Sequence, residues 1–169
     1  RYLALTQRGT AALVGQLPYA VRPDVGTAAW ISCAGHLPYG QPLDQRHDDA
    51  DSLRWDFDPD GLEIAGNARV ELSLSVTAPV ATVSAKLTDV AADGSSTLVA
   101  RGTLNLTRRA GMDTAEPLVP GEVYDVVVEL EATAYQWRPG HTLRLSVAGA
   151  DWPNTSAPPE PVSISVRGG

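Results

Sequence analysis

The sequence predicts an all-β protein, and three observations support this. Apolar and polar residues alternate with a period of two in several separate segments, as expected for strands that bury one face. Turn-forming residues such as Gly66-Asn67, Pro120-Gly121 and Pro139-Gly140 fall between these segments. No window combines a sustained 3.6-residue apolar period with helix caps at both ends.

Seven alternating segments predict half-buried antiparallel strands. They cover residues 52–57, 68–76, 82–88, 97–106, 123–132, 142–147 and 161–167. In segment 82–88 the alternation directs Val83, Ala85 and Leu87 inward and leaves the intervening polar residues, Lys86 among them, on the opposite face. Weaker runs at 2–6 (YLALT) and 28–33 (AAWISC) bring the total to about eight or nine strands, a normal number for a β-sandwich.

The connections follow from turn chemistry. Residues 92–95 (ADGS) lie between two predicted strands and indicate a hairpin. Segment 34–51 is polar, contains prolines and has no period, and residues 108–121 form a second irregular loop. We expect the first loop to carry function, because rigid scaffolds present binding residues on loops.

Length and charge limit the possible functions. The 169 residues fit one domain, 1–169. A net charge of −7, with twelve arginines and Lys86 scattered along the chain, argues against nucleic acid and against an anionic membrane surface as partners. No apolar stretch is long enough to span a bilayer. The chain starts without Met or a signal-peptide pattern, so we expect a piece of a longer protein, cytoplasmic rather than secreted.

An acidic cluster precedes the first of these strands. The cluster contains Asp44, His47, Asp48, Asp49 and Asp51, all of which are possible metal ligands. Their spacing does not force them to converge, so a solvated loop with turn hydrogen bonds is the favoured interpretation and no metal is predicted.

The stretch DFDPDG, residues 56–61, matches the opening of a calcium-binding EF-hand loop. An EF-hand needs a bidentate Glu at the twelfth position, which here is Asn67, and it needs flanking helices. A plain Asp-rich turn explains these residues.

The chain has no G-x-S-x-G nucleophile elbow. Cys33 and His36 lie three residues apart, but nothing positions a third group, so packing is favoured over a reactive thiolate. His141 follows the Pro139-Gly140 turn. Without an identifiable serine to activate, His141 is predicted to be a structural anchor, together with Gly140, that donates to a loop carbonyl.

The four tryptophans allow a second interpretation, a free-standing carbohydrate-binding β-sandwich in which they stack on sugar rings. Trp55 has the inward parity of its strand, and Trp137 lies just before a turn. Core or edge packing is therefore favoured, and glycan binding remains the alternative.

Four motifs in a fixed order carry a family resemblance. They are DQRHDD (44–49), KLTDVAADG (86–94), PGEVYDVVVEL (120–130) and PGHTLRLSV (139–147) with the later WP. From about Trp30 to Asn154 the chain resembles the C-terminal domain of the X-Pro dipeptidyl-peptidase and cocaine-esterase-like serine hydrolases. The resemblance implies a galactose-binding-domain-like jelly-roll β-sandwich.

The resemblance also implies which domain carries the catalytic residues. In that family the Ser-Asp-His triad belongs to an α/β-hydrolase domain with a helical cap, so no catalytic residue and no cofactor are expected in this chain. The expected partners are those hydrolase and cap domains of the same polypeptide. Loop 31–42 corresponds to the family segment that approaches the active site, which makes His36, Leu37 and Tyr39 candidates for the substrate-pocket wall. The Gly140-His141 pair matches a position outside the triad.

Overall fold

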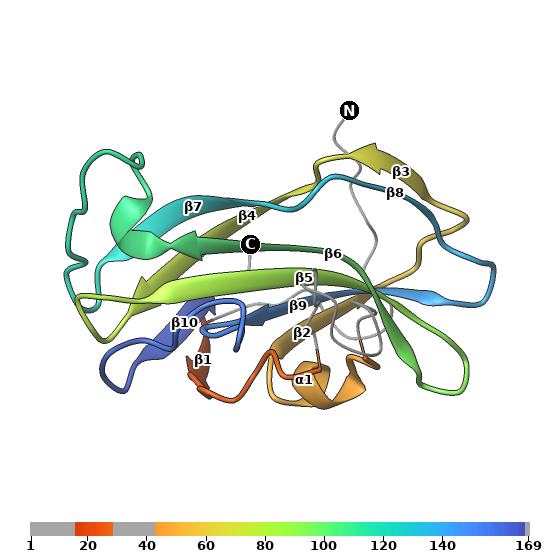
Figure 1. Ribbon diagram of the computed structural model, residues 1–169, viewed down its shortest axis with the longest axis horizontal. Helices are drawn as coiled ribbons and strands as arrows, with labels where there is room; N and C mark the ends of the chain where they lie inside the picture. The colour runs from red at the N-terminus through yellow and green to blue at the C-terminus, as the bar shows by residue number, and fades with distance from the viewer. Residues whose placement is uncertain (1–15, 29–42, 168–169) are drawn as a thin grey trace.

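The computed structural model describes residues 16–28 and 43–167, which form two packed antiparallel sheets (Figure 1). One sheet has the strand order β1-β10-β4-β7 and the other the order β2-β9-β5-β6, while β3 and β8 form a separate two-stranded ladder. The strands are β1 (Gln16–Ala20), β2 (Leu53–Phe57), β3 (Glu63–Gly66), β4 (Arg69–Val76), β5 (Thr82–Val90), β6 (Ser96–Asn105), β7 (Val123–Glu129), β8 (Thr133–Gln136), β9 (Thr142–Ala148) and β10 (Ser163–Arg167).

The strand order is that of a jelly roll. β5 and β6 form a hairpin within one sheet, whereas the connections β4–β5, β6–β7 and β9–β10 cross from one sheet to the other. The predicted all-β sandwich is therefore confirmed, and so is the hairpin at residues 92–95, where Ala91 N–H donates to the Ser95 carbonyl at 2.9 Å.

All seven alternating segments contain strands, but three strands were not predicted. β1 has five residues, and β3 and β8 have four each. The β3–β8 ladder extends beyond the sandwich (Figure 1), so it buries no continuous face and leaves little periodic signal. The predicted strand at 2–6, and the run at 28–33 apart from Ala28, lie outside the described residues.

Two short helices complete the described part of the chain. α1 (Arg46–Ala50) lies inside the segment predicted to be an irregular loop, and a 3-10 turn covers Leu106–Arg108. Within the described ranges, no helix is long and apolar enough to cross a membrane.

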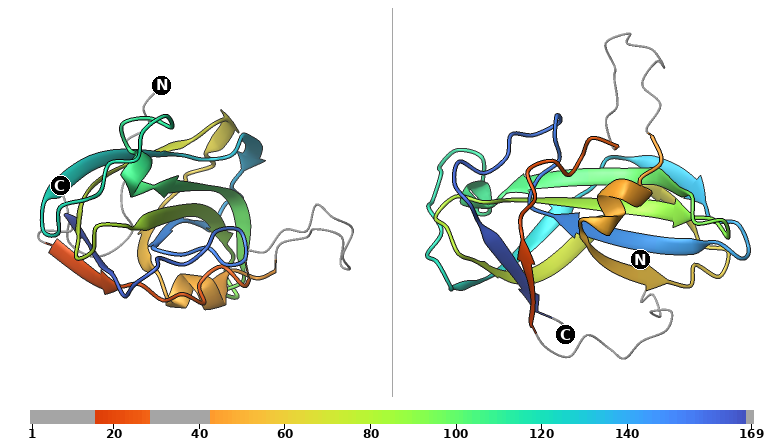
Figure 2. Two further views of the ribbon diagram at one scale, coloured as in Figure 1. Left: turned by 60° about the vertical axis from the view of Figure 1, so that its left-hand side comes forward. Right: turned by 90° about the horizontal axis from the view of Figure 1, so that it is seen from below.

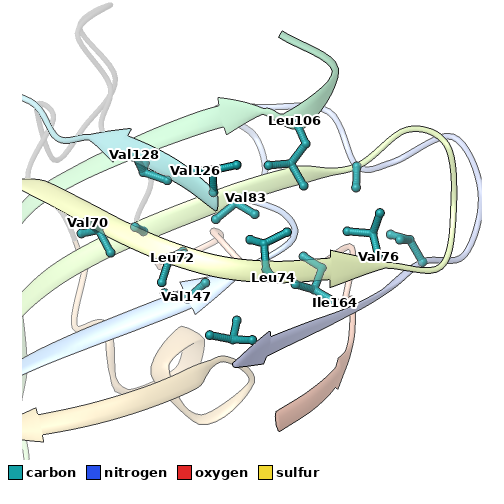
Figure 3. Packing of buried hydrophobic residues seen from close by; sticks show 14 of the residues in the cluster. Val70, Leu72, Leu74, Val76, Val83, Leu106, Val126, Val128, Val147 and Ile164 are labelled. Carbon is teal, nitrogen blue, oxygen red and sulfur yellow. The ribbon is translucent and has the colours of Figure 1, made fainter. Parts of the chain in front are cut away.

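The core lies between the two sheets (Figure 3). Leu74 of β4, Val83 of β5 and Ile164 of β10 are completely buried, as their inward parity predicts. Along one side the sandwich is closed by β6 and β7, where Glu131 N–H donates to the Arg101 carbonyl at 2.8 Å. The approach is close enough that a Cβ atom on Gly102 would lie 2.1 Å from the Glu129 carbonyl oxygen.

The outer face of the β2-β9-β5-β6 sheet is also covered. The sequence pattern places Ser84, Lys86 and Thr88 on the face opposite the core, where one-sided burial would expose them, but all three are buried. α1 lies across this face (Figure 2, right), and the segments 22–28 and 149–155 are joined to each other there. A second layer of the molecule therefore packs on a sheet face that simple alternation would assign to solvent.

Candidate functional site

The covered outer face holds a buried ionic cluster centred on Lys86. Its ammonium nitrogen lies 3.3 Å from Asp48 Oδ2 and 3.3 Å from Asp151 Oδ1, and the Arg101 guanidinium is 3.7 Å from the other Asp151 oxygen. The Lys86, Asp48 and Asp151 side chains are 4%, 2% and 1% exposed. Buried charges need partners of this kind, because an unpaired one would lose its hydration without compensation.

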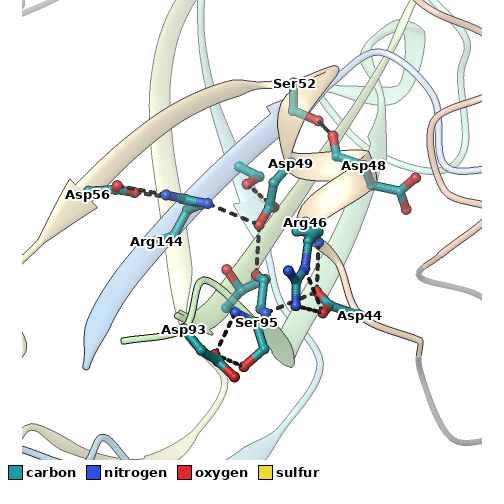
Figure 4. A network of polar contacts seen from close by, with 12 residues as sticks. Asp44, Arg46, Asp48, Asp49, Ser52, Asp56, Asp93, Ser95 and Arg144 are labelled. Carbon is teal, nitrogen blue, oxygen red and sulfur yellow. Dashed lines mark hydrogen bonds and ion pairs between the residues drawn. The ribbon is translucent and has the colours of Figure 1, made fainter. Parts of the chain in front are cut away.

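Asp49, the next residue of α1, accepts three side-chain hydrogen bonds (Figure 4). Ser146 Oγ donates to it at 2.6 Å, Ser96 Oγ at 2.7 Å and the Arg144 guanidinium at 3.4 Å. Arg144 also makes a bidentate contact with Asp56 at 2.6 and 2.8 Å, and this carboxylate raises the pKa of Arg144. These bonds join α1 to strands β6 and β9, and Arg144 links β9 in turn to Asp56 of β2.

The network continues to the two ends of residues 29–42. Gln45 is fully buried, and its side-chain amide donates to the Ala28 carbonyl at 2.7 Å and to the Leu43 carbonyl at 2.6 Å. Ala28 N–H donates to Asp48 Oδ2 at 3.2 Å. Ala28 and Leu43, the residues directly before and after 29–42, are therefore both held by the buried network.

The candidate metal ligands make separate contacts with protein groups. Asp44 pairs with Arg46 at 2.6 Å, which lowers the pKa of Asp44 to about 2, and Asp51 pairs with Arg22 at 3.1 Å. Within the described ranges no group of three or more His, Cys, Asp or Glu side chains could hold a metal ion. The expectation of a solvated loop is wrong for Asp48 and Asp49, which are buried counter-ions rather than turn residues.

DFDPDG forms the turn that the sequence suggested. Asp60 N–H donates to Asp58 Oδ1 at 3.1 Å, and Asp60 and Gly61 both adopt positive φ angles. Strands β2 and β3 flank the turn in place of the helices of an EF-hand.

Two large apolar side chains are exposed beside the buried network. Leu43 is 54% exposed and Trp152 is 51% exposed. Both are bonded through their backbones to the same short segment, because Leu43 N–H donates to the Ala28 carbonyl and Trp152 N–H donates to the Val25 carbonyl. We call Leu43 and Trp152, with the 25–28 segment between them, the apolar shoulder.

His141 contacts an acidic partner on the neighbouring strand β5. Its Nδ1–H donates to Asp89 Oδ1 at 2.8 Å, and Tyr135 O–H donates to Asp89 Oδ2 at 2.7 Å. Burial and the Asp89 carboxylate raise the pKa of Tyr135 to about 12. The partner is therefore a carboxylate rather than the expected loop carbonyl, and Gly140 with its φ of 82° forms the turn that leads into β9. The anchor role itself stays a prediction.

The tryptophans divide between core and surface. Trp55 and Trp137 are buried, and Trp137 contacts Tyr135 edge to face, with ring centroids 5.1 Å apart. Of the tryptophans in the described segments, only Trp152 is exposed, which counts against a row of rings stacking on a glycan. Trp30, Cys33 and the predicted pocket residues His36, Leu37 and Tyr39 lie outside the described residues.

Sequence reasoning missed the Lys86–Asp151 pair and the covering layer that contains it. One signal was present. Lys86 is the only lysine of the chain. It lies in the middle of the nine-residue strand β5, between Ala85 and Leu87, whose parity directs them to the core. A strongly hydrated ammonium is unusual there unless carboxylates from other segments pair with it.

The architecture defines a class of protein, the jelly-roll β-sandwich domains. The family model for the X-Pro dipeptidyl-peptidase C-terminal non-catalytic domain matches residues 7–169. The chain belongs to this family.

The relatives are enzymes several times longer than this chain. Cocaine esterase of Rhodococcus sp. (strain MB1 Bresler) is 29% identical over 116 residues, which cover 66% of this chain and 20% of the esterase. The fold matches an aminopeptidase from a marine sediment Thaumarchaeota archaeon, with a TM-score of 0.78 and 21% identity, over 92% of this chain and 31% of the other. It also matches an α-amino acid ester hydrolase with a TM-score of 0.78 and 20% identity, over 91% of this chain and 30% of that one.

Proposed function

We propose that this chain is the accessory domain of a serine hydrolase of the X-Pro dipeptidyl-peptidase or acyl-esterase type. Its α/β-hydrolase and cap domains would belong to the same polypeptide and supply the catalytic triad. The match to a non-catalytic domain family over residues 7–169 supports this proposal, as does the fact that the chain spans only a fifth of the cocaine esterase.

The physical role in the proposal has two parts. The apolar shoulder packs on the hydrolase domain, because exposed large apolar side chains lose their unfavourable hydration in an interface. Loop 31–42, with His36, Leu37 and Tyr39, forms part of the substrate-pocket wall.

One observation carries this assignment. Ala28 and Leu43, which flank residues 29–42, accept hydrogen bonds from the buried Gln45 amide, and Ala28 N–H also donates to Asp48; Leu43 itself is exposed. Precise positioning of a pocket wall requires support of this kind, because misplacement by about 1 Å can lower a rate by about 10²-fold.

The experiment compares three proteins, namely the complete polypeptide, its hydrolase part alone and residues 1–169 alone. Turnover of an X-Pro anilide and of an aryl ester is measured for each. We expect turnover by the complete polypeptide, none by residues 1–169, and a reduced kcat/KM for the hydrolase part alone. Hydrolysis by residues 1–169 that persists after repurification would contradict the proposal.

Variants of the complete polypeptide separate docking from pocket formation. Trp152→Ser is expected to weaken the association between the hydrolase part and residues 1–169, measured by proteolytic release or by reconstitution in trans. Tyr39→Ala is expected to change KM clearly and the free energy of unfolding only slightly. The matched control is Met112→Ser, since Met112 is 79% exposed and lies in the irregular 108–121 loop, outside both sites. If Trp152→Ser and Tyr39→Ala behave like this control, neither site has its proposed role.

A further inference from the structure

The sandwich is open at one end, where a groove of about 1020 Å³ enters between the two sheets. Its floor consists of side chains from β2, β5 and β9, the opposite wall is the first half of β4, and β3 contributes a third side. Phe57, Leu87 and Leu145 of the floor are only partly buried, although all three have the parity of core residues. The groove is therefore an unfilled part of the core with an apolar floor.

The groove lies beside a strand edge of β4. β7 pairs with β4 along Arg69–Ser75, whereas β10 pairs only with Leu74–Val76. Within residues 16–28 and 43–167, the Arg69–Ser73 part of β4 thus has a strand on one side only. An edge of this kind presents N–H and C=O groups to which one more extended segment can bond. Every second side chain of such a segment would point toward the groove floor.

The rim of the groove carries negative charge that no cation neutralises. Glu63 of β3 and Glu71 of β4 are exposed, and in the described part of the chain their side chains make no ion pair and no hydrogen bond. Arg69, the guanidinium at this rim, lies 3.3 Å from Glu129 of β7. A lysine or arginine in a segment that fills the groove would therefore be attracted to the two carboxylates.

We propose that an extended segment of the hydrolase part of the polypeptide fills this groove, bonds to the Arg69–Ser73 edge of β4 and pairs a lysine or arginine with Glu71. This contact presupposes the proposed function, because the segment belongs to the hydrolase part, and it is separate from the apolar shoulder. The fold makes up only 31% and 30% of the matching aminopeptidase and ester hydrolase chains, so a polypeptide of this kind has chain available for the segment. Apolar side chains at its alternate positions remove Phe57 and Leu145 from water.

Hydrogen exchange tests the contact with the strand edge. The backbone amides of Arg69–Ser73 are compared in the complete polypeptide and in residues 1–169 alone. We expect the amides that face the open edge to exchange about 10-fold more slowly, or slower still, in the complete polypeptide, because the added segment accepts their hydrogen bonds. Equal exchange in the two proteins would overturn the proposal. Slow exchange in residues 1–169 alone that depends on protein concentration would also overturn it, because a second copy would then occupy the groove.

A charge reversal tests the ion pair. In Glu71→Lys the rim repels the cation of the segment, so we expect the affinity of residues 1–169 for the hydrolase part in trans to fall about 10-fold. Exchange within Arg69–Ser73 of the complete polypeptide should become faster in the same variant. The matched control is Glu160→Lys, at an exposed position three residues before Ser163, whose backbone bonds to Thr77 beyond the other end of β4. The control should leave both measurements at the wild-type values.

The binding experiment in trans separates the groove from the accessory role. Residues 1–169 that do not associate with the hydrolase part would contradict the proposed function and the groove contact together. Association that is weakened by Trp152→Ser but is the same in Glu71→Lys and Glu160→Lys would overturn the groove contact alone. Both substituted glutamates are exposed, so neither variant removes a core side chain.

Discussion

Removal of the Lys86 ammonium should strongly destabilise the protein. In Lys86→Met the volume of the side chain is nearly kept, but Asp48 and Asp151 lose a cation 3.3 Å from each. Both carboxylates are almost completely buried, and loss of one member of a buried ion pair costs about 3–5 kcal/mol. Asp48 keeps the Ala28 N–H and Asp151 keeps Arg101, so we expect the lower end of this range, about 3 kcal/mol.

The assay is chemical denaturation of the chain followed by circular dichroism, with thermal unfolding as a second readout. For a chain of this size, a loss of about 3 kcal/mol corresponds to a midpoint about 6–12 °C lower. The matched control is Arg69→Met, which removes an exposed pair with Glu129 and should cost about 0–1 kcal/mol.

A compensated variant tests the mechanism itself. Lys86→Met combined with Asp48→Asn and Asp151→Asn removes the uncompensated charges, so it should recover a large part of the lost stability. A Lys86→Met protein as stable as Arg69→Met would refute the reasoning. So would a triple variant less stable than the single one, because the penalty would then not come from stranded carboxylates.

Three further predictions concern other parts of the sandwich. The depressed pKa of Asp44 contributes stability above about pH 4, and this contribution is lost as the pH falls to about 2. Asp44→Asn should therefore lower the free energy of unfolding by at most about 1 kcal/mol at neutral pH, because the pair with Arg46 is partly exposed. In acid the variant and the wild type should be equally stable. In an ultraviolet absorbance titration of the folded protein, Tyr135 should ionise only near pH 12, and Tyr135→Phe should remove that step. Gly102→Ala should lower the unfolding midpoint more than Gly149→Ala, because its Cβ meets a rigid backbone carbonyl rather than side chains that can rotate.

The sequence was sufficient to predict the strands that bury only one face, the face toward the core. In β4, Val70, Leu72 and Leu74 alternate with polar residues, and a half-buried strand is the only simple explanation of that period. It was insufficient for β5, in which both faces are buried. The cover on its outer face comes from α1 and from Asp151, and no local pattern encodes which distant segment will lie over a strand.

The same limit applies to the candidate site. The Pro139-Gly140 turn and the position of His141 at the start of β9 could be predicted from local chemistry. The partner of His141 could not, because Asp89 is 52 residues away and is brought there by the pairing of β5 with β9. The Lys86 cluster is likewise assembled from three segments far apart in the chain.

Departures from simple alternation in this molecule mark the places where something else must pack. On the outer face of β5, polar residues are buried because α1 and neighbouring segments cover them, and the ionic cluster supplies the required partners. On the inner face, at the open end of the sandwich, core residues such as Phe57 and Leu145 are incompletely buried. Apolar surface of this kind is stabilised by any segment that removes it from water.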